Sequence, residues 1–415
     1  MSKFLFTMLP ANDLGLPTRL LPIARLLEDR GHQVALFNPA PAPAKLIADA
    51  GFVNLPMPSR PMPAIQGDMA GASAAWDVEE MFGHFFSDEE TLRSATSAHV
   101  EVVESYGPDV VVDSFGLFTC MAARVLGIPV ASVLQGNFHP ASDGFRWWNG
   151  ARPEGLPSAA AAVNAVLAEY GVATVERAVD LLAGELSLIV GTPETDPVSP
   201  AANAAHVGSI IWQTGDARLP GWVDELSPDK PVVWVYAGNP RYFGGSMSNP
   251  FDSIVVIRAA IASLGNAPMH VVLTSGYQDL PEEVGPLPSN FLHAAYLPGR
   301  AMASRCNLMV HHGGHSSVMT GLSAGTPAVI IPTSTERESN ARRVTTLGAG
   351  EMVKPTEAIH GEKQIELADF SAKVNRCLTE NSYRTAARRV CESMSRYGGA
   401  EQAADRIEQL AAAKG

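Results

Sequence analysis

The chain has 415 residues, of which 46% are hydrophobic and 18% are charged, and its formal net charge is −13. This length exceeds what one hydrophobic core usually fills, so we expect two domains. The negative charge argues against nucleic acid and anionic membranes as binding partners.

Targeting and metal-binding signals are missing from the sequence. Pro10 and Asp13 interrupt the N-terminal segment too early for a signal peptide, and no apolar run approaches the length of a membrane span. The four cysteines have no CxxC or ribbon spacing, which indicates reduced structural residues. The protein is therefore expected to be soluble and cytoplasmic.

Predicted strands and helices alternate in the first half of the chain. The strands cover residues 4–8, 33–37, 110–115, 130–135 and 186–192. The helices cover roughly residues 19–30, 43–50, 117–126 and 159–184. Such alternation implies a mostly parallel, doubly wound sheet.

The second half repeats this alternation after a proline-rich, loop-like stretch at 193–231. Its predicted strands cover residues 232–238, 270–276, 292–298, 308–314 and 328–332, with a helix near 252–263 and a helical C-terminus. The predicted boundaries give an N-terminal domain (1–212), a hinge (213–230), a C-terminal domain (231–390) and a terminal helix (391–415). The expected fold class is α/β, with two Rossmann-like domains facing each other across a cleft.

The most informative stretch, residues 308–344, reads as a strand, a glycine turn, a helix and a second strand. Gly313 and Gly314 allow backbone to approach a ligand closely, and a helix N-terminus attracts an anion. These features predict a phosphate or diphosphate site, although a tight turn alone would also use glycine. Adjacent His311 and His312 point to opposite faces of a strand, so no metal site is predicted.

The same stretch resembles the nucleotide-sugar motif of family 1 glycosyltransferases of the GT-B fold. The matching residues are His312-Gly313-Gly314-His315-Ser316-Ser317, Ala324-Gly325-Thr326-Pro327, Pro332, Glu336-Arg337 and Asn340-Ala341-Arg342-Arg343-Val344. The resemblance implies a nucleotide-sugar cosubstrate bound by the C-terminal domain, no separate cofactor, and a terminal helix that returns to the N-terminal domain.

The resemblance also assigns donor-binding roles outside the motif. It implies base stacking by Tyr296 with backbone contacts at Leu297, a phosphate-side turn at Asn239 and a donor-facing hydroxyl on Thr274. Packing at a strand end remains an alternative for Tyr296, and Thr274 has the ordinary alternative of a β-branched strand residue.

Thr320 stands where relatives that use UDP-sugars carry a glutamate that binds the ribose hydroxyls. A carboxylate facing a sugar without the 2′-hydroxyl would lose a partner, so threonine favours a dTDP-sugar over a UDP-sugar. A neutral replacement on the helix face is nearly as well supported.

Glu336 and Arg337 occupy the positions of the family's sugar-contacting acidic residue and glutamine. Arginine accepts no hydrogen bond and carries a fixed charge. It could accommodate an unusual sugar, turn away, or pair with Glu336 or Glu338, which places glucose as the sugar in doubt.

The general base is the main departure from the family. The usual histidine near the first strand aligns with Leu14 or Leu16, and neither leucine can move a proton. Asp13 and Asp113 are equal candidates and His139 is a third. Asp13 has the competing explanation of a helix N-cap.

The implied reaction is an inverting transfer to a small apolar natural product, such as a polyketide, a macrolide or an aromatic aglycone. Candidate acceptor-binding residues in the N-terminal domain are Phe85, Phe115, Phe145 and Trp147. A non-catalytic nucleotide-sugar binder and a GT-B epimerase are the alternatives, and a homodimer is one arrangement considered.

Overall fold

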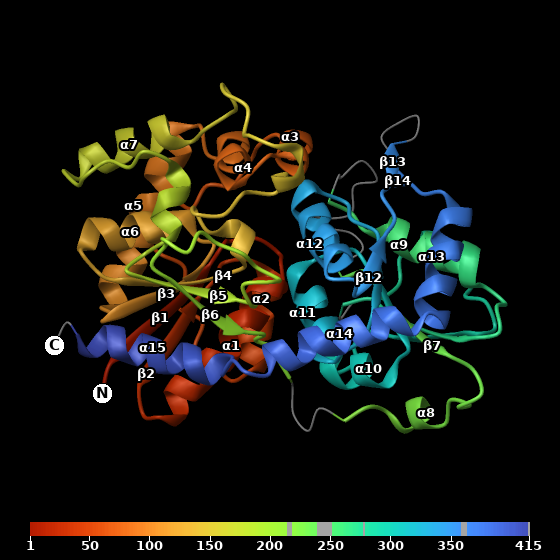
Figure 1. The fold of residues 1–415 in the computed structure, drawn as a ribbon. Coiled ribbons are helices and arrows are strands. Elements are labelled where there is room, and N and C mark those ends of the chain that lie inside the picture. Colours follow the sequence, from red (N-terminus) through yellow and green to blue (C-terminus); the bar gives the residue numbers. More distant parts are fainter. Residues whose placement is uncertain (214–217, 239–250, 277–278, 358–362, 414–415) are drawn as a thin grey trace. The chain divides into compact units, whose positions relative to one another are not determined.

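The computed structural model describes residues 1–213, 218–238, 251–276, 279–357 and 363–413 (Figure 1). The chain forms two compact units. Unit 1 comprises Met1–Trp212 with Tyr397–Gly415, and unit 2 comprises Gln213–Arg396. The predicted residue Asn239 lies outside the described residues.

Unit 1 is built on a six-stranded parallel sheet with the order β2-β1-β3-β4-β5-β6. The strands are β1 (Lys3–Met8), β2 (Gln33–Phe37), β3 (Val110–Ser114), β4 (Val130–Leu134), β5 (Leu186–Val190) and β6 (Ala204–Gly208). The central strands β3 and β4 are buried along their whole length, as expected for a parallel sheet with both faces covered.

The helices of unit 1 are α1 (Gly15–Asp29), α2 (Pro41–Asp49), α3 (Met69–Ala74), α4 (Val78–Phe85), α5 (Glu89–Tyr106), α6 (Leu117–Leu126), α7 (Ala160–Glu169) and α15 (Ala400–Ala412). Helix α5 packs against α6 and α7, and α1 packs against α15.

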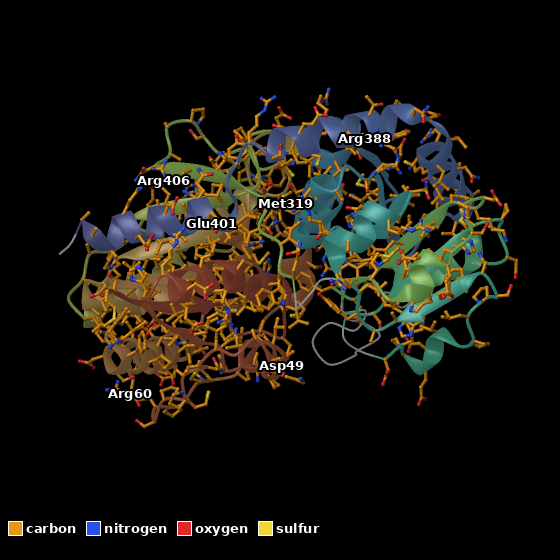
Figure 2. All side chains as sticks on the ribbon, turned by 90° about the horizontal axis from the view of Figure 1, so that it is seen from below. Asp49, Arg60, Met319, Arg388, Glu401 and Arg406 are labelled. Carbon is orange, nitrogen blue, oxygen red and sulfur yellow. The ribbon has the colours of Figure 1, made fainter. Side chains whose placement is uncertain are left out.

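The last helix, α15, is held to unit 1 by charged and backbone contacts. Arg30 pairs with three carboxylates of α15, those of Glu401, Asp405 and Glu408, at 2.6 to 2.8 Å. Glu401 and Arg406 lie on the exposed side of this helix (Figure 2). The Gly399 N–H donates to the Val207 carbonyl, which fixes the start of α15 beside β6.

Unit 2 contains a second six-stranded parallel sheet, ordered β12-β11-β10-β7-β8-β9, and a small antiparallel β13-β14 pair. The strands are β7 (Val232–Tyr236), β8 (His270–Thr274), β9 (Phe291–Ala294), β10 (Leu308–His311), β11 (Ala328–Ile330), β12 (Gly350–Met352), β13 (Thr356–Glu357) and β14 (Lys363–Gln364). The helices are α8 (Gly221–Asp224), α9 (Ile254–Leu264), α10 (Gly299–Arg305), α11 (His315–Ser323), α12 (Thr335–Thr346), α13 (Leu367–Thr379) and α14 (Asn381–Met394).

The hydrophobic residues of unit 2 form a core on each face of its sheet. Val233 and Val235 of β7 belong to one core cluster, whereas Val232 and Trp234 belong to the other. Alternate strand residues therefore bury opposite faces, as a doubly wound sheet requires. The predicted fold class, α/β with two parallel sheets, is confirmed.

Candidate functional site

The turn between β10 and α11 is shaped by glycine. Gly313 has a φ of +90°, and a Cβ at this position would lie 2.9 Å from the carbonyl oxygen of Arg337. The Gly313 N–H donates to Nδ1 of His311 at 3.1 Å, so the buried His311 shapes the turn from the strand side. Both the φ angle and the close approach of α12 require glycine here.

His312 occupies a narrow slot between two glycines. A Cβ on Gly238 would lie 2.7 Å from its Cε1, and one on Gly314 would lie 2.5 Å from its Nε2. The ring is 8% exposed, and Nδ1 has no hydrogen-bond partner within the described part of the chain. Burial, helped by the nearby Arg337 guanidinium and His311, holds the pKa of His312 well below 6.5. The imidazole is therefore neutral and contributes hydrogen bonding rather than charge.

Helix α11 begins directly after this turn, with Gly314 as its N-cap. His315 and Ser317 are buried, whereas Ser316 is half-buried. Unpaired N–H groups and the positive dipole end characterise the first turn of any helix. The predicted motif residues therefore gather where a diphosphate would find donors.

The hydroxyl of Thr320 is turned toward its own helix. Its Oγ1 donates to the carbonyl of Ser316 at 2.8 Å, while its methyl group would lie 3.3 Å from a Cβ on Gly299. Thr320 consequently presents an apolar methyl group toward the start of α10.

Arg337 is buried and turned toward the backbone beside α9. Its Nη1 donates to the Phe251 carbonyl at 2.7 Å and to the hydroxyl of Thr333. Glu338, one of the predicted partners, instead pairs with Arg342 and Lys354. Of the alternatives that the sequence left open, this geometry favours an arginine that turns away.

Tyr296, which is predicted to stack on the nucleotide base, is half-buried beyond β9, and Leu297 is part of the core. The hydroxyl of Thr274 accepts a hydrogen bond from Nε1 of Trp234 at 2.9 Å, which gives Thr274 a packing role. Trp234 also stacks on Tyr236, whose ring meets that of His312 edge-on. This pair of β7 aromatics was not predicted from the sequence, in which only the alternation of the strand residues could have indicated it.

In unit 1, Asp113 lies at the end of β3 and is 1% exposed. Its carboxylate accepts hydrogen bonds from the hydroxyl of Thr7 and from the Gly116 N–H, both at 2.6 Å. Burial raises the pKa of Asp113 to about 7, although these bonds and Cys120 favour the carboxylate. The raised pKa suits a base, but the contacts and the burial leave an acceptor little access.

Asp113 also supports a strained backbone. Phe115 has a φ of +67°, a conformation that is unfavourable for a bulky residue. The bond from Gly116 to Asp113 closes the turn around it. Asp113 therefore holds the end of β3 in shape.

The buried carboxyl group makes folding stability pH-dependent. The folded pKa of about 7 lies above the ordinary aspartate pKa of 3.8, so the folded protein keeps a proton that the unfolded chain releases between these pH values. The contribution of Asp113 to stability should therefore be largest near pH 4 and should be lost as the pH rises to 7, a change of up to about 4 kcal/mol. Urea unfolding of the wild type and of Asp113→Asn at both pH values tests this. An equal change in the free energy of unfolding of the two proteins between these pH values would contradict this expectation.

Asp13 lies in the loop between β1 and α1 and is half-buried. Its Oδ1 accepts the N–H of Leu16 at 3.1 Å, so it does cap the first turn of α1. Leu14 is half-buried and Leu16 is buried. Compared with Asp113, the carboxyl group of Asp13 is the more accessible of the two predicted bases.

His139 uses both ring nitrogens within unit 1. Nδ1 accepts the Ala141 N–H at 3.1 Å, so the proton resides on Nε2, which donates to Ser187 at 3.1 Å. Burial, with Arg177 and His206 nearby, lowers the pKa of His139 to about 4. This geometry argues against the third predicted base.

Two of the four predicted acceptor-binding aromatics are core residues. Phe115 stacks on Phe138 with ring centroids 4.1 Å apart, and Phe145 is fully buried. Phe85 and Trp147 are half-buried, so they remain candidates. The aromatic residues beyond β3 and β4 thus form packing contacts that composition alone could not separate from a binding surface.

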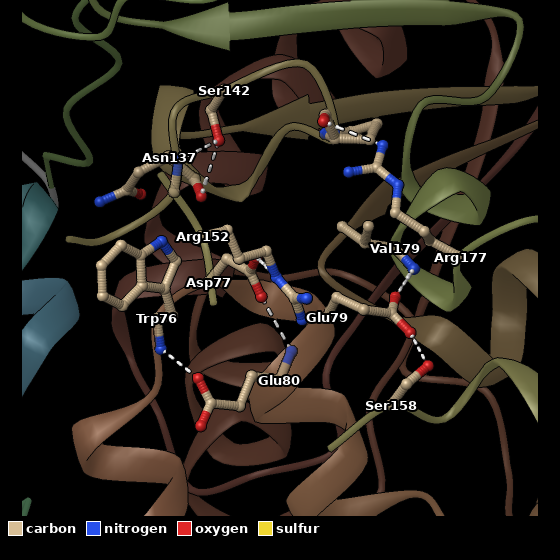
Figure 3. A network of polar contacts seen from close by, with 12 residues as sticks. Trp76, Asp77, Glu79, Glu80, Asn137, Ser142, Arg152, Ser158, Arg177 and Val179 are labelled. Atoms are coloured by element: carbon tan, nitrogen blue, oxygen red, sulfur yellow. Dashed lines mark hydrogen bonds and ion pairs between the residues drawn. The ribbon is translucent and has the colours of Figure 1, made fainter. Parts of the chain in front are cut away.

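A buried polar network fixes α4 (Figure 3). Glu79 is 4% exposed and accepts hydrogen bonds from the hydroxyl of Ser158 and from the Val179 N–H. Asp77, at the start of α4, pairs with Arg152 at 2.5 Å. These contacts tie α4, which carries Phe85, to two later segments, and they were not predicted from the sequence.

Within the described residues, no group of three or more histidine, cysteine or acidic side chains could hold a metal ion. No helix among the same residues has the length and apolar character needed to cross a membrane.

Sequence comparisons identify the type of protein. Residues 258–410 match the family described as erythromycin biosynthesis protein CIII-like, C-terminal domain. A PGL/p-HBAD biosynthesis glycosyltransferase of Mycobacterium tuberculosis is 25% identical over 333 residues, which cover 75% of this chain and 72% of that protein. Demethyllactenocin mycarosyltransferase of Streptomyces fradiae is 32% identical over 155 residues, which cover 37% of this chain and 32% of that protein.

Solved structures share the fold over the whole chain. Glycosyltransferase VinC, in complex with dTDP, aligns with a TM-score of 0.71 and 19% identity over 99% of each chain. SnogD from Streptomyces nogalater aligns with a TM-score of 0.67 and 22% identity over 99% of each chain. The protein is therefore a glycosyltransferase of the GT-B fold, and it is similar to enzymes of bacterial natural-product and glycolipid biosynthesis.

Proposed function

We propose that this enzyme transfers a sugar, with inversion, from a dTDP-sugar to a small apolar acceptor such as a polyketide, a macrolide or an aromatic aglycone. The observation that supports the donor site most is the buried Nδ1 of His312, which has no partner among the described residues and lies beside the N-terminus of α11. A diphosphate would satisfy this nitrogen and the helix N–H groups together. The scheme requires no metal ion, because helix and side-chain donors receive the leaving charge.

In this scheme the acceptor oxygen attacks the anomeric carbon as the bond from that carbon to the diphosphate oxygen breaks. The acceptor proton passes to Asp13, and dTDP leaves with the bonding electrons. Asp13 is preferred to Asp113 because Asp113 is buried and already accepts hydrogen bonds from Thr7 and Gly116. The half-buried Phe85 and Trp147 are the proposed acceptor contacts.

The preference for dTDP rests on Thr320. Because its hydroxyl donates its only hydrogen to the Ser316 carbonyl, the side chain has no N–H or O–H group left to donate to a ribose, and its methyl group is apolar. A 2′-deoxyribose loses nothing at such a surface, whereas a ribose 2′-hydroxyl would find no carboxylate there to accept its hydrogen.

Thermal-shift measurements with dTDP, UDP, GDP and ADP test the donor site, because a ligand that binds only the folded state raises the Tm. The proposal predicts the largest shift with dTDP. A larger shift with UDP would overturn the proposed donor preference, and no shift with any nucleotide would overturn the donor site itself.

Replacing Thr320 with glutamate is expected to raise the affinity for UDP relative to dTDP by about tenfold, because a carboxylate accepts from ribose hydroxyls. Thr345→Glu is the matched control, since Thr345 also donates back to its own helix, at 3.1 Å to Ala341. Calorimetric titration of both nucleotides measures the ratio of affinities. An unchanged ratio in Thr320→Glu would place Thr320 outside the ribose site.

A further inference from the structure

A single side-chain amide connects the two parts of the candidate donor site. Asn340 lies one turn after Glu336 on α12 and is 8% exposed. Its Nδ2 donates to the Gly313 carbonyl at 3.0 Å and to Oε1 of Glu336 at 2.8 Å. A primary amide has two N–H groups, so this nitrogen donates one to each of these two acceptors.

The acceptors belong to different elements. Gly313 forms the turn beside His312, whereas Glu336 lies in the first turn of α12, at the position proposed to contact the transferred sugar. The start of α12 also lies close to the turn, since a Cβ on Gly313 would lie 2.9 Å from the Arg337 carbonyl oxygen. The amide therefore fixes the Glu336 carboxylate relative to the turn.

We infer that Asn340 is a positioning residue, which orients the Glu336 carboxylate toward the hydroxyls of the donor sugar. The inference rests on the proposed function. An aspartate in its place would direct an oxygen at both a carbonyl and a carboxylate, so only a donor with two N–H groups suits this position. Because the bond to Glu336 is charge-assisted, its loss should change binding of the sugar by about tenfold to a hundredfold.

The test compares each nucleotide with its own sugar derivative by calorimetric titration: dTDP with dTDP-glucose and dTDP-rhamnose, and UDP with UDP-glucose. The variants are Asn340→Leu, Asn340→Ser, which retains a small polar side chain should leucine prevent folding, and Glu336→Ala. Asn164→Ser is the matched control, because Asn164 makes comparable bonds to the Val175 backbone in unit 1.

In the Asn340 variants we expect nucleotide affinity to stay within about threefold of the wild type, while the gain in affinity from the sugar falls about tenfold or more. In the Glu336→Ala background, adding the Asn340 change should have no further effect on that gain, because the two residues act as one unit. Asn164→Ser should lower only the Tm.

Three results would overturn the inference: equal loss of nucleotide and nucleotide-sugar binding in the Asn340 variants, additive losses in the double variant, or a wild type that gains no affinity from any sugar. A wild type that binds no nucleotide at all would overturn the proposed function and this inference with it.

Discussion

Replacing His312 with alanine is expected to lower kcat/KM by about a hundredfold to a thousandfold, the usual cost of removing a donor that faces developing negative charge. The ring is held between Gly238 and Gly314, and its buried Nδ1 has no partner among the described residues. The variant should therefore lose stabilisation of the leaving diphosphate. His312→Gln, which keeps an amide donor, should recover part of the rate.

The pH profile tests the neutral state of His312 directly. Because burial holds its pKa well below 6.5, the rate should show no loss from His312 between about pH 6 and 7. Steady-state kinetics of wild type and His312→Gln should give profiles of the same shape in this range. A decrease in the rate below about pH 6.5 that disappears in His312→Gln would contradict this expectation. His270→Gln is the control, at a histidine outside the candidate donor site.

Replacing Asp13 with asparagine should lower kcat by about a hundredfold to ten-thousandfold, the range for loss of a general base. The affinity for dTDP should not change, because the proposed role of Asp13 is to take the acceptor proton and not to contact the nucleotide. Single-turnover rates and calorimetry on the same preparation separate the two effects.

Asp88→Asn is the matched control for this experiment. Asp88 caps α5 by accepting the Thr91 N–H at 2.8 Å, much as Asp13 accepts the Leu16 N–H at 3.1 Å. If Asp13 only caps a helix, both variants should lose a similar amount of stability and neither should lose activity. A fully active Asp13→Asn enzyme would show that Asp13 is not the general base and would favour Asp113 instead.

Local signals in the sequence were sufficient for most of the fold. The predicted helix at 117–126 matches α6, because its apolar run ends at Gly127, which takes a left-handed conformation. The predicted helix at 159–184 is wrong in length, since α7 ends at Glu169 and Gly171 has a φ of +69°. Strand β6, AAHVG, was missed because small and polar residues carry little strand propensity and its pairing with β5 is a tertiary contact.

Some residues of the candidate site could be predicted from the local sequence, whereas others could not. The motif around His312 was predictable because one local segment supplies the strand, the turn and the helix start. The roles of Phe145, His139 and Arg337 depend on contacts with distant segments, and the sequence does not show whether a side chain faces a ligand or the core. The amide bridge from Asn340 to Gly313 joins residues 27 positions apart, so it too appears only in the folded chain.

The most direct measurement is turnover itself. Purified protein is incubated with dTDP-glucose or dTDP-rhamnose and a panel of phenolic, polyketide and macrolide acceptors, and dTDP release is followed together with product mass and anomeric configuration. We expect dTDP release that depends on the acceptor, and a glycoside of inverted configuration. Conversion of the donor without an acceptor, or donor binding without any turnover, would contradict it.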